Sequence, residues 1–202
     1  MQVKDMFLKN ETYFYFILII FFLLISFKTY STTNDKGAVL DYLASLKYFS
    51  ASFIQNDGEG LSEGRVYIGE KRIRAEYLLP SKILIILDED KAMYYNYDLD
   101  EDEFFNPQKT NAWFFYDIFR NPIFFEDSSI KVKANEMILE KVGTNEDTKY
   151  IIKVYFEKSP LVIRAIEVIV NDDFIKLSIY NHNYNQEFDR EFFKLINPKF
   201  FN

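Results

Sequence analysis

Few side chains in this sequence are of the types that carry catalysis. His182 is the only histidine in 202 residues, and it stands in a turn-like run between Asn181 and Asn183. A histidine in such a turn is more often a surface residue than a base or a metal ligand. The chain has no cysteine, which excludes disulfides, thiolate nucleophiles and cysteine-type zinc sites. No nucleophile elbow, glycine-rich phosphate loop or metal-binding spacing occurs, so we predict a protein that is not an enzyme and needs no cofactor or metal.

Acidic residues are concentrated in one short run. Residues 98–103 hold five carboxylates, but they lack the glycine and the regular ligand spacing of a calcium loop, so we expect a solvated loop there. The whole chain has 24 Lys and Arg against 31 Asp and Glu, a formal net charge of -7, and no run of basic residues. It therefore lacks the basic stripe that a nucleic-acid backbone requires, and we predict no nucleic-acid partner.

Apolar side chains at alternate positions are the remaining candidates for function. Aromatic residues make up 19% of the chain, with 22 Phe and 15 Tyr, and either AT-biased coding or an aromatic-lined cavity explains this content. Between residues 64 and 99 apolar and polar residues alternate, as at Val66 and Ile68 or Ile73 and Tyr77. This period is typical of strands with one buried face, and short polar turns divide the stretch into four strands.

The segments that would position this face follow in order along the chain. Residues 34–48 have the apolar spacing of one amphipathic helix, and residues 49–55 change to the alternation of a strand. Residues 109–119 carry too many large apolar side chains for an exposed loop, so we predict a short helix laid over the mouth of the sheet as a lid. Further strands are expected at 129–133, 137–142, 149–157, 161–170, 174–180 and 188–195.

These elements predict an α+β fold that is mainly β. The expected architecture is a single curved antiparallel half-barrel of about ten strands, with an N-terminal helix and an inserted lid helix. Two helices cannot fill the concave side of so wide a sheet. The residual apolar surface is then either a collapsed core or a cavity for a hydrophobic ligand, and the pattern alone does not separate the two.

The N-terminal residues carry an export signature. Lys4 and Lys9 precede residues 13–27, an uncharged apolar run of 15 residues. A bilayer span needs about 20 residues, and a charged segment followed by an apolar run is the order of a secretory signal. We predict a signal peptide at residues 1–30, with a retained N-terminal anchor as the alternative, and one exported domain at residues 31–202.

Several motifs resemble those of the periplasmic lipoprotein carriers of LolA type. The resemblance is specific over residues 40–100, and it implies a half-barrel chaperone that binds lipoprotein acyl chains in a hydrophobic cavity. Such a carrier would transport them through the periplasm from the inner to the outer membrane. The motifs are, in order, F-x-A-x-F-x-Q at 49–55, G-x-V-x-I at 64–68, I-R at 73–74, Y-x-x-P at 77–80 and Y-Y-N at 94–96.

The resemblance also implies partners and a site. The partners would be acylated lipoproteins, an inner-membrane ABC-type lipoprotein release complex and an outer-membrane lipoprotein receptor, and we expect the carrier to be a monomer. The lid would close the cavity with Trp113, Phe114 and Ile118. The expected acyl-chain cavity residues are Phe49, Phe53, Val66, Ile68, Ile73, Tyr77, Ile83, Ile85, Met93, Tyr95 and Tyr97.

One family feature is missing at its expected place. In the family an Arg-Pro pair supplies an arginine that holds the lid closed, and this pair falls here on Gly69 and Glu70. Arg72 and Arg74 are predicted to point to the face of the sheet opposite Ile73. Two other functions share the half-barrel. One is a sensor of lipid or mislocalised lipoprotein that signals through a protein partner, and the other is a generic binder of hydrophobic ligands.

Overall fold

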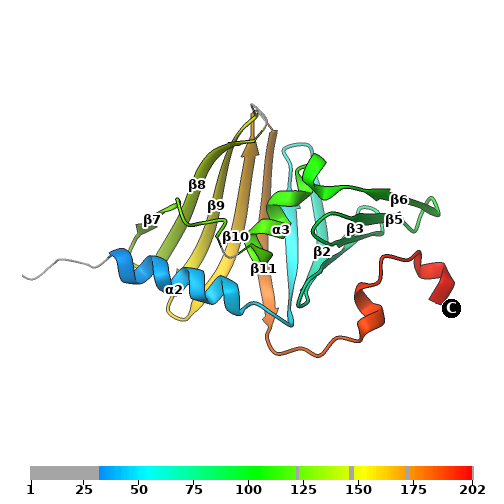
Figure 1. Ribbon diagram of the computed structural model, residues 1–202, viewed down its shortest axis with the longest axis horizontal. Coiled ribbons are helices and arrows are strands. Elements are labelled where there is room, and N and C mark those ends of the chain that lie inside the picture. Colours follow the sequence, from blue (N-terminus) through cyan, green and yellow to red (C-terminus); the bar gives the residue numbers. More distant parts are fainter. Residues whose placement is uncertain (1–31, 122, 146–147, 172, 202) are drawn as a thin grey trace, which may run out of the picture. The chain divides into compact units, whose positions relative to one another are not determined.

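The computed structural model describes residues 32–121, 123–145, 148–171 and 173–201 (Figure 1). The predicted export segment, residues 1–30, lies outside this part of the chain.

Within the described residues, eleven strands form one antiparallel sheet in the order β6-β5-β4-β3-β2-β1-β11-β10-β9-β8-β7. The edge strands β6 and β7 do not pair with each other, so the sheet is open and the predicted mainly β half-barrel is confirmed. The strands are β1 (Phe49–Asn56), β2 (Leu61–Ile68), β3 (Ile73–Leu79), β4 (Ile83–Leu87), β5 (Ala92–Asn96), β6 (Glu101–Phe105), β7 (Ser129–Val132), β8 (Glu136–Asn145), β9 (Thr148–Lys158), β10 (Leu161–Val170) and β11 (Asp173–Asn183), and the short 3-10 helices are η1 (Pro107–Lys109), η2 (Arg190–Phe193) and η3 (Pro198–Phe201).

Alternation and turn chemistry explain why these segments become strands. β1 buries every second residue from Phe49 to Phe53, the pattern expected of a strand with one face in the core. The hairpin into β2 turns at Asp57, whose Oδ1 accepts hydrogen bonds from the backbone N–H groups of Glu59 and Gly60, both at 3.0 Å. Such a side-chain-to-backbone turn ends one strand and fixes the start of the next.

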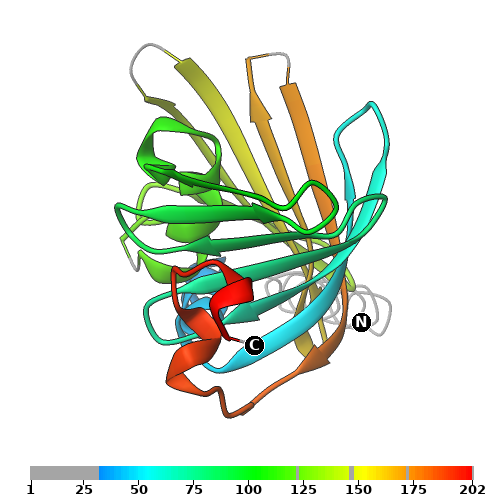
Figure 2. The same ribbon diagram turned by 90° about the vertical axis from the view of Figure 1, so that its right-hand side faces the viewer.

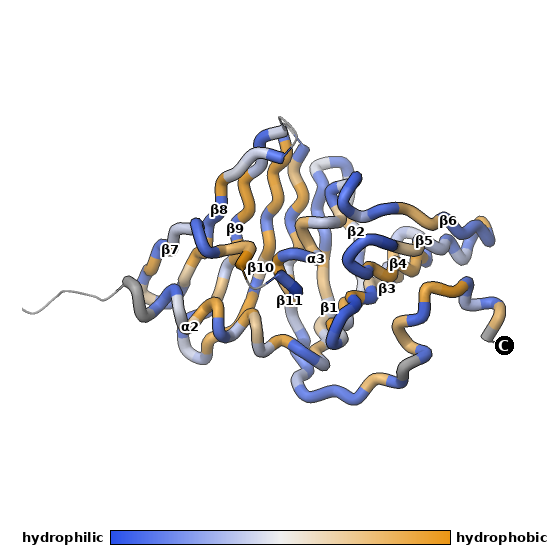
Figure 3. Tube along the Cα trace, viewed as in Figure 1, coloured by the Kyte–Doolittle hydropathy of each residue, from blue (hydrophilic) through white to orange (hydrophobic). Residues whose placement is uncertain are grey.

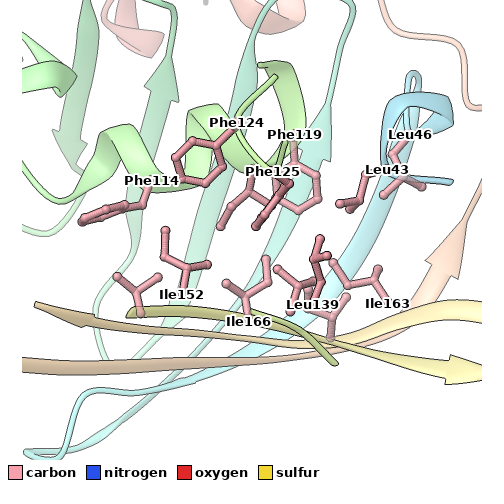
Figure 4. Close-up of a cluster of buried hydrophobic side chains, with 14 of the residues drawn as sticks. Leu43, Leu46, Phe114, Phe119, Phe124, Phe125, Leu139, Ile152, Ile163 and Ile166 are labelled. Atoms are coloured by element: carbon pink, nitrogen blue, oxygen red, sulfur yellow. The ribbon is translucent and has the colours of Figure 1, made fainter. Parts of the chain in front are cut away.

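Two helices, α2 (Thr32–Ser45) and α3 (Ala112–Arg120), lie on one face of the sheet, which we call the inner face (Figure 1). Figure 3 shows that the strands behind them carry many apolar residues. Side chains from both helices and from the segment after α3 meet those of the sheet in the main core (Figure 4). Its members include Leu43, Leu46, Phe114, Phe119, Phe124, Phe125, Leu139, Ile152, Ile163 and Ile166.

The opposite, outer face of the sheet has an apolar cluster of its own. It is buried because the C-terminal segment, residues 186–200, crosses it, and Leu195 packs against it. Figure 2 shows this segment in front of strands β3 to β5. The cluster comprises Leu84 and Ile86 of β4 with Met93 and Tyr95 of β5, and each is at most 1% exposed.

The strand predicted at residues 188–195 is not present, and this segment is held by side chains instead. Arg74 donates a hydrogen bond to the carbonyl of Phe192 at 2.8 Å, and its guanidinium carbon lies 4.3 Å from the centre of the Phe192 ring. Arg72 donates to the carbonyl of Phe193 at 3.0 Å. Both arginines thus lie on the outer face, as their spacing predicted, and they satisfy backbone groups that a strand would have paired with a neighbour.

The acidic run predicted to be a solvated loop is in part an edge strand. Residues 101–105 form β6, and the run contacts the C-terminal segment. Asn197 Nδ2 donates to Asp102 Oδ1 at 2.8 Å, and Lys199 pairs with Asp100. Carboxylates on an edge strand also discourage edge-to-edge pairing with other chains. The difference arises because paired backbone groups, which the composition of the run does not reveal, place these acids in the sheet.

The C-terminal segment should contribute measurably to stability. We expect Phe193→Ala to lower the free energy of unfolding by about 3 kcal/mol, because its ring is 9% exposed and packs on Gly69, where an added Cβ would lie 2.9 Å from it. Phe200→Ala is the control, since this side chain is 80% exposed and its loss should change stability by no more than about 0.5 kcal/mol. Urea denaturation measures both, and equal stability of the two variants would contradict the packing described here.

Candidate ligand-binding cavity

An apolar cavity of about 250 Å³ lies between α3 and the inner face of the sheet. Its few polar groups include Tyr77 and Gln55, which are bonded to each other, Oη to Oε1 at 2.8 Å. A lining of this kind favours hydrocarbon over water. The lining residues are Phe53 and Gln55 of β1, Val66 of β2, Ile73, Ala75 and Tyr77 of β3, Ile85 and Leu87 of β4, Phe105 of β6, Asn111, Ala112, Phe115 and Phe119 at α3, Ile166 of β10, and Ile175, Leu177 and Ile179 of β11.

Strand register forms the floor of this cavity. Ala75 pairs with Val66 on one side and with Ile85 on the other, so the three side chains form a row across β2, β3 and β4 on the inner face. Gly64 lies opposite Phe53, and an added Cβ there would come 2.6 Å from the Phe53 ring. The missing side chain lets the ring lie across β2, which is why this strand carries a glycine in its interior.

The structure brings five of the eleven predicted cavity residues together. Phe49 and Ile68 are instead buried in the main core, and Ile83 is a half-buried residue of the inner face outside the lining. The five that line the cavity are Phe53, Val66, Ile73, Tyr77 and Ile85.

Three predicted residues lie elsewhere because the inner and outer faces of β5 were exchanged in the prediction. Met93 and Tyr95 are in the outer cluster, and Tyr97 follows the end of β5, where its ring contacts that of Tyr95 at 4.6 Å. The inner face of β5 carries Ala92 and Tyr94, which pair with Leu87 and Ile85 of β4. The more apolar face of this strand points outward because the C-terminal segment covers it.

The lid helix α3 also presents a different set of side chains to the cavity from the one predicted. Trp113 and Phe114 pack on Tyr150 of β9, with ring centres 5.6 and 5.0 Å apart, and Ile118 is buried. The cavity is instead lined by Ala112, Phe115 and Phe119, which recur every three or four residues on the neighbouring stripe of the helix. Because α3 is apolar on several sides, periodicity did not identify the stripe that faces the cavity.

Arg120, at the end of α3, joins this helix to the rest of the domain and was not identified from the sequence. Its Nη2 donates to the carbonyl of Leu46, just after α2, and its Nη1 donates to the carbonyl of Glu70 at 3.5 Å. We call this pair of hydrogen bonds the Arg120 latch. Burial lowers the pKa of the guanidinium, and its Nε is buried without a hydrogen-bond partner. A buried donor without a partner costs free energy, so part of the stabilisation from the two hydrogen bonds is offset.

His182 is not the surface loop residue that its neighbours predicted. It lies half-buried in β11, with Nε2 2.7 Å from the carbonyl oxygen of Ile163 and its ring against those of Phe49 and Tyr184. Burial lowers its pKa. Within the described ranges, no three His, Asp or Glu side chains are grouped to hold a metal ion.

Comparison with known proteins places the chain in a family. The model of the family described as outer membrane lipoprotein carrier protein LolA matches residues 44–196. The chain belongs to this LolA family. The match extends from the end of α2 through the cavity and α3 into the C-terminal segment, so all of these elements are part of the LolA-family domain.

Solved structures resemble the fold of this LolA-family chain. An uncharacterized conserved protein from Thermus thermophilus is 12% identical with a TM-score of 0.53, and the match covers 83% of this chain and 96% of that one. MucB is 11% identical with a TM-score of 0.48, over 80% of this chain and 62% of the MucB chain. The chain therefore spans about three fifths of the length of MucB. No curated protein sequence matches the chain.

Gly69 and Glu70, which stand at the place of the missing Arg-Pro pair, make contacts of their own. In this LolA-family chain Gly69 makes room for Phe193 on the outer face, and the carbonyl of Glu70 accepts a hydrogen bond from the lid. Arg120 is thus on the lid, and one of its backbone acceptors is on the β2–β3 turn.

Among the residues placed by the structure, no helix is long and apolar enough to cross a membrane.

Tyr77 should give the cavity a signature at alkaline pH. Burial, with a smaller effect of the Asp57 charge, raises the pKa of Tyr77 from 10.0 to about 12. The unfolded chain therefore loses this proton at lower pH than the folded chain, and the stabilisation is complete below pH 10 and lost as the pH rises toward 12. We expect Tyr77→Phe to reduce the fall in unfolding free energy over this interval, as measured by urea denaturation at a series of pH values. An unchanged fall would place the hydroxyl in contact with water.

The Arg120 latch should control the opening of α3. We expect Arg120→Met to speed amide hydrogen exchange in α3 by about tenfold, because hydrogen bonds from a charged donor contribute roughly 1.5–3 kcal/mol and part of this is offset by relief of the buried Nε. Arg164→Met is the control, since Arg164 pairs with Glu157 at the surface. Exchange in α3 that is equal in the two variants would show that the latch does not hold the lid.

Proposed function

We propose that this protein is a periplasmic carrier that takes lipoprotein acyl chains into the cavity beneath α3 and transfers them from the inner to the outer membrane. The observation that carries the proposal is the cavity itself, about 250 Å³ of space with an almost wholly apolar lining beneath α3. Membership of the LolA family supports the choice of cargo.

The volume of the cavity limits what the closed form can hold. An apolar cavity of about 150 Å³ holds benzene, so this one has space for roughly ten hydrocarbon carbons. Burial of about ten methylenes at about 0.8 kcal/mol each contributes up to ~8 kcal/mol before the costs of association. A longer chain requires side chains of the lid to move, so loading and lid opening are coupled.

The lid meets the second requirement of a soluble carrier, which is to hide its apolar surface when empty. In the closed form Phe115 and Phe119 cover the cavity, and the Arg120 latch joins the end of the lid to the rest of the domain. Opening breaks two hydrogen bonds, one of them 3.5 Å long. Opening also exposes the buried side chains of α3, so burial of the acyl chain has to offset both costs before cargo can hold the lid open.

The surface charge supports a route through protein partners. The formal net charge of -7 disfavours adsorption to anionic lipid head groups. In this proposal an inner-membrane ABC-type release complex supplies the lipoprotein, and an outer-membrane receptor accepts it.

Retention of a lipopeptide in solution tests the proposal. The purified protein is mixed with a diacylated lipopeptide in detergent, the detergent is removed, and the lipopeptide left in the supernatant after ultracentrifugation is measured. We expect the wild type to keep it soluble. Ala75→Leu fills the middle of the cavity floor and should weaken binding about tenfold, whereas Ala38→Leu, at an exposed position of α2, should not.

Other outcomes identify the alternatives or reject the proposal. Precipitation of the lipopeptide with the wild type would contradict a carrier role. If the wild type then bound a single-chain fatty acid, and Ala75→Leu prevented this, the protein would be a generic binder of hydrophobic ligands. The size of the closed cavity is the observation that favours this second candidate.

A further inference from the structure

A second cavity adjoins the first. It measures about 480 Å³ and lies between α2, α3, the β2–β3 turn and the β4–β5 turn. Among the described residues, Phe119 is the only one that lines both cavities. Its side chain is 8% exposed, and Figure 4 shows it beside Phe125 in the segment that covers the sheet. Phe119 therefore lies at the boundary of the two cavities.

The two cavities follow each other along the same strands. Ile73 and Leu87 are a register pair at the ends of β3 and β4, and both line the first cavity. Lys71, just before β3, and Asp88, just after β4, line the second. The second cavity therefore begins where the start of β3 and the end of β4 border the first, at the turns beyond these strand ends.

The second cavity differs from the first in chemical character. Leu40 and Leu43 of α2 contribute apolar surface, while Lys47, Glu70 and Glu89 contribute charges of both signs. A site of mixed sign does not select a simple anion or cation. It suits a ligand whose polar groups include both acceptors and donors of hydrogen bonds, such as ester carbonyls, which accept, and peptide groups, which accept through C=O and donate through N–H.

We propose that Phe119 is a gate and that the second cavity binds the polar part of an acylated peptide, namely the glyceryl ester and the first peptide groups next to the acyl chain. This inference rests on the proposed function and assigns the place of each part of the cargo. The first cavity holds roughly ten carbons, so a long chain fills it and its polar end must lie at one of its boundaries. Rotation of the Phe119 side chain between rotamers joins the cavities without a change of backbone.

Filling the second cavity from α2 tests this assignment. Ala44 lines the second cavity and is exposed on α2, so Ala44→Trp should fold normally. Ala38→Trp is the matched control, since Ala38 is exposed on the same helix and does not line the cavity. We expect Ala44→Trp to bind a palmitoylated glyceryl peptide about tenfold more weakly than the control. Octanol, which needs only the first cavity, should bind equally to both variants.

Chain-length dependence tests the gate. We expect Phe119→Ala to raise the ratio of palmitoyl-peptide affinity to octanoyl-peptide affinity about tenfold over the wild type, because the long ligand no longer has to displace the ring. Equal palmitoyl-peptide affinities of the Ala44→Trp and Ala38→Trp variants, or an unchanged ratio in Phe119→Ala, would overturn the inference while leaving the carrier function intact. Absence of acyl-peptide binding in the wild type would overturn the carrier function and this inference with it.

Discussion

An open sheet of eleven strands presents more apolar inner surface than two helices can cover, and the structure depends on how this mismatch is resolved. α2 and the segment after α3 pack tightly on one part of the sheet, where their side chains form the main core. Over β1 to β4 the lid stands away from the floor and a cavity remains. Natural cores are close-packed, so an empty apolar space of this size costs stability. A bound hydrocarbon removes that cost.

On the outer face of the same sheet, the chain itself covers the apolar cluster. β4 is apolar on both faces, and its outward side chains join those of β5 in a second cluster that is almost completely buried. The C-terminal segment covers this cluster without forming a strand, since Arg72 and Arg74 satisfy its carbonyls. The sheet therefore has one face that is covered by the C-terminal segment and one on which an apolar cavity remains.

The β2–β3 turn connects these two faces. On the outer side Gly69 gives Phe193 room to pack, and on the inner side the carbonyl of Glu70 accepts a hydrogen bond from Arg120. Lid and C-terminal segment are thus fastened to neighbouring residues of one short turn. In the Arg120 latch the charged donor belongs to α3, and its acceptors belong to the rest of the domain. Because these acceptors are neutral carbonyls, breaking the two bonds would leave no buried carboxylate unpaired.

The sequence by itself determined most of the strands, the lid helix and the half-barrel, because periodicity and turn residues act locally, but it missed β6 and predicted a strand at 188–195 that the structure does not have. It also determined which residues share a face, but not which face points inward. For β5 that choice depended on the distant C-terminal segment, so Met93 and Tyr95 were assigned to the wrong side. The partners of Arg120 are backbone carbonyls outside the lid, which have no signature in the sequence. The volume beneath α3 is what remains after all side chains have packed, and only the tertiary structure decides it.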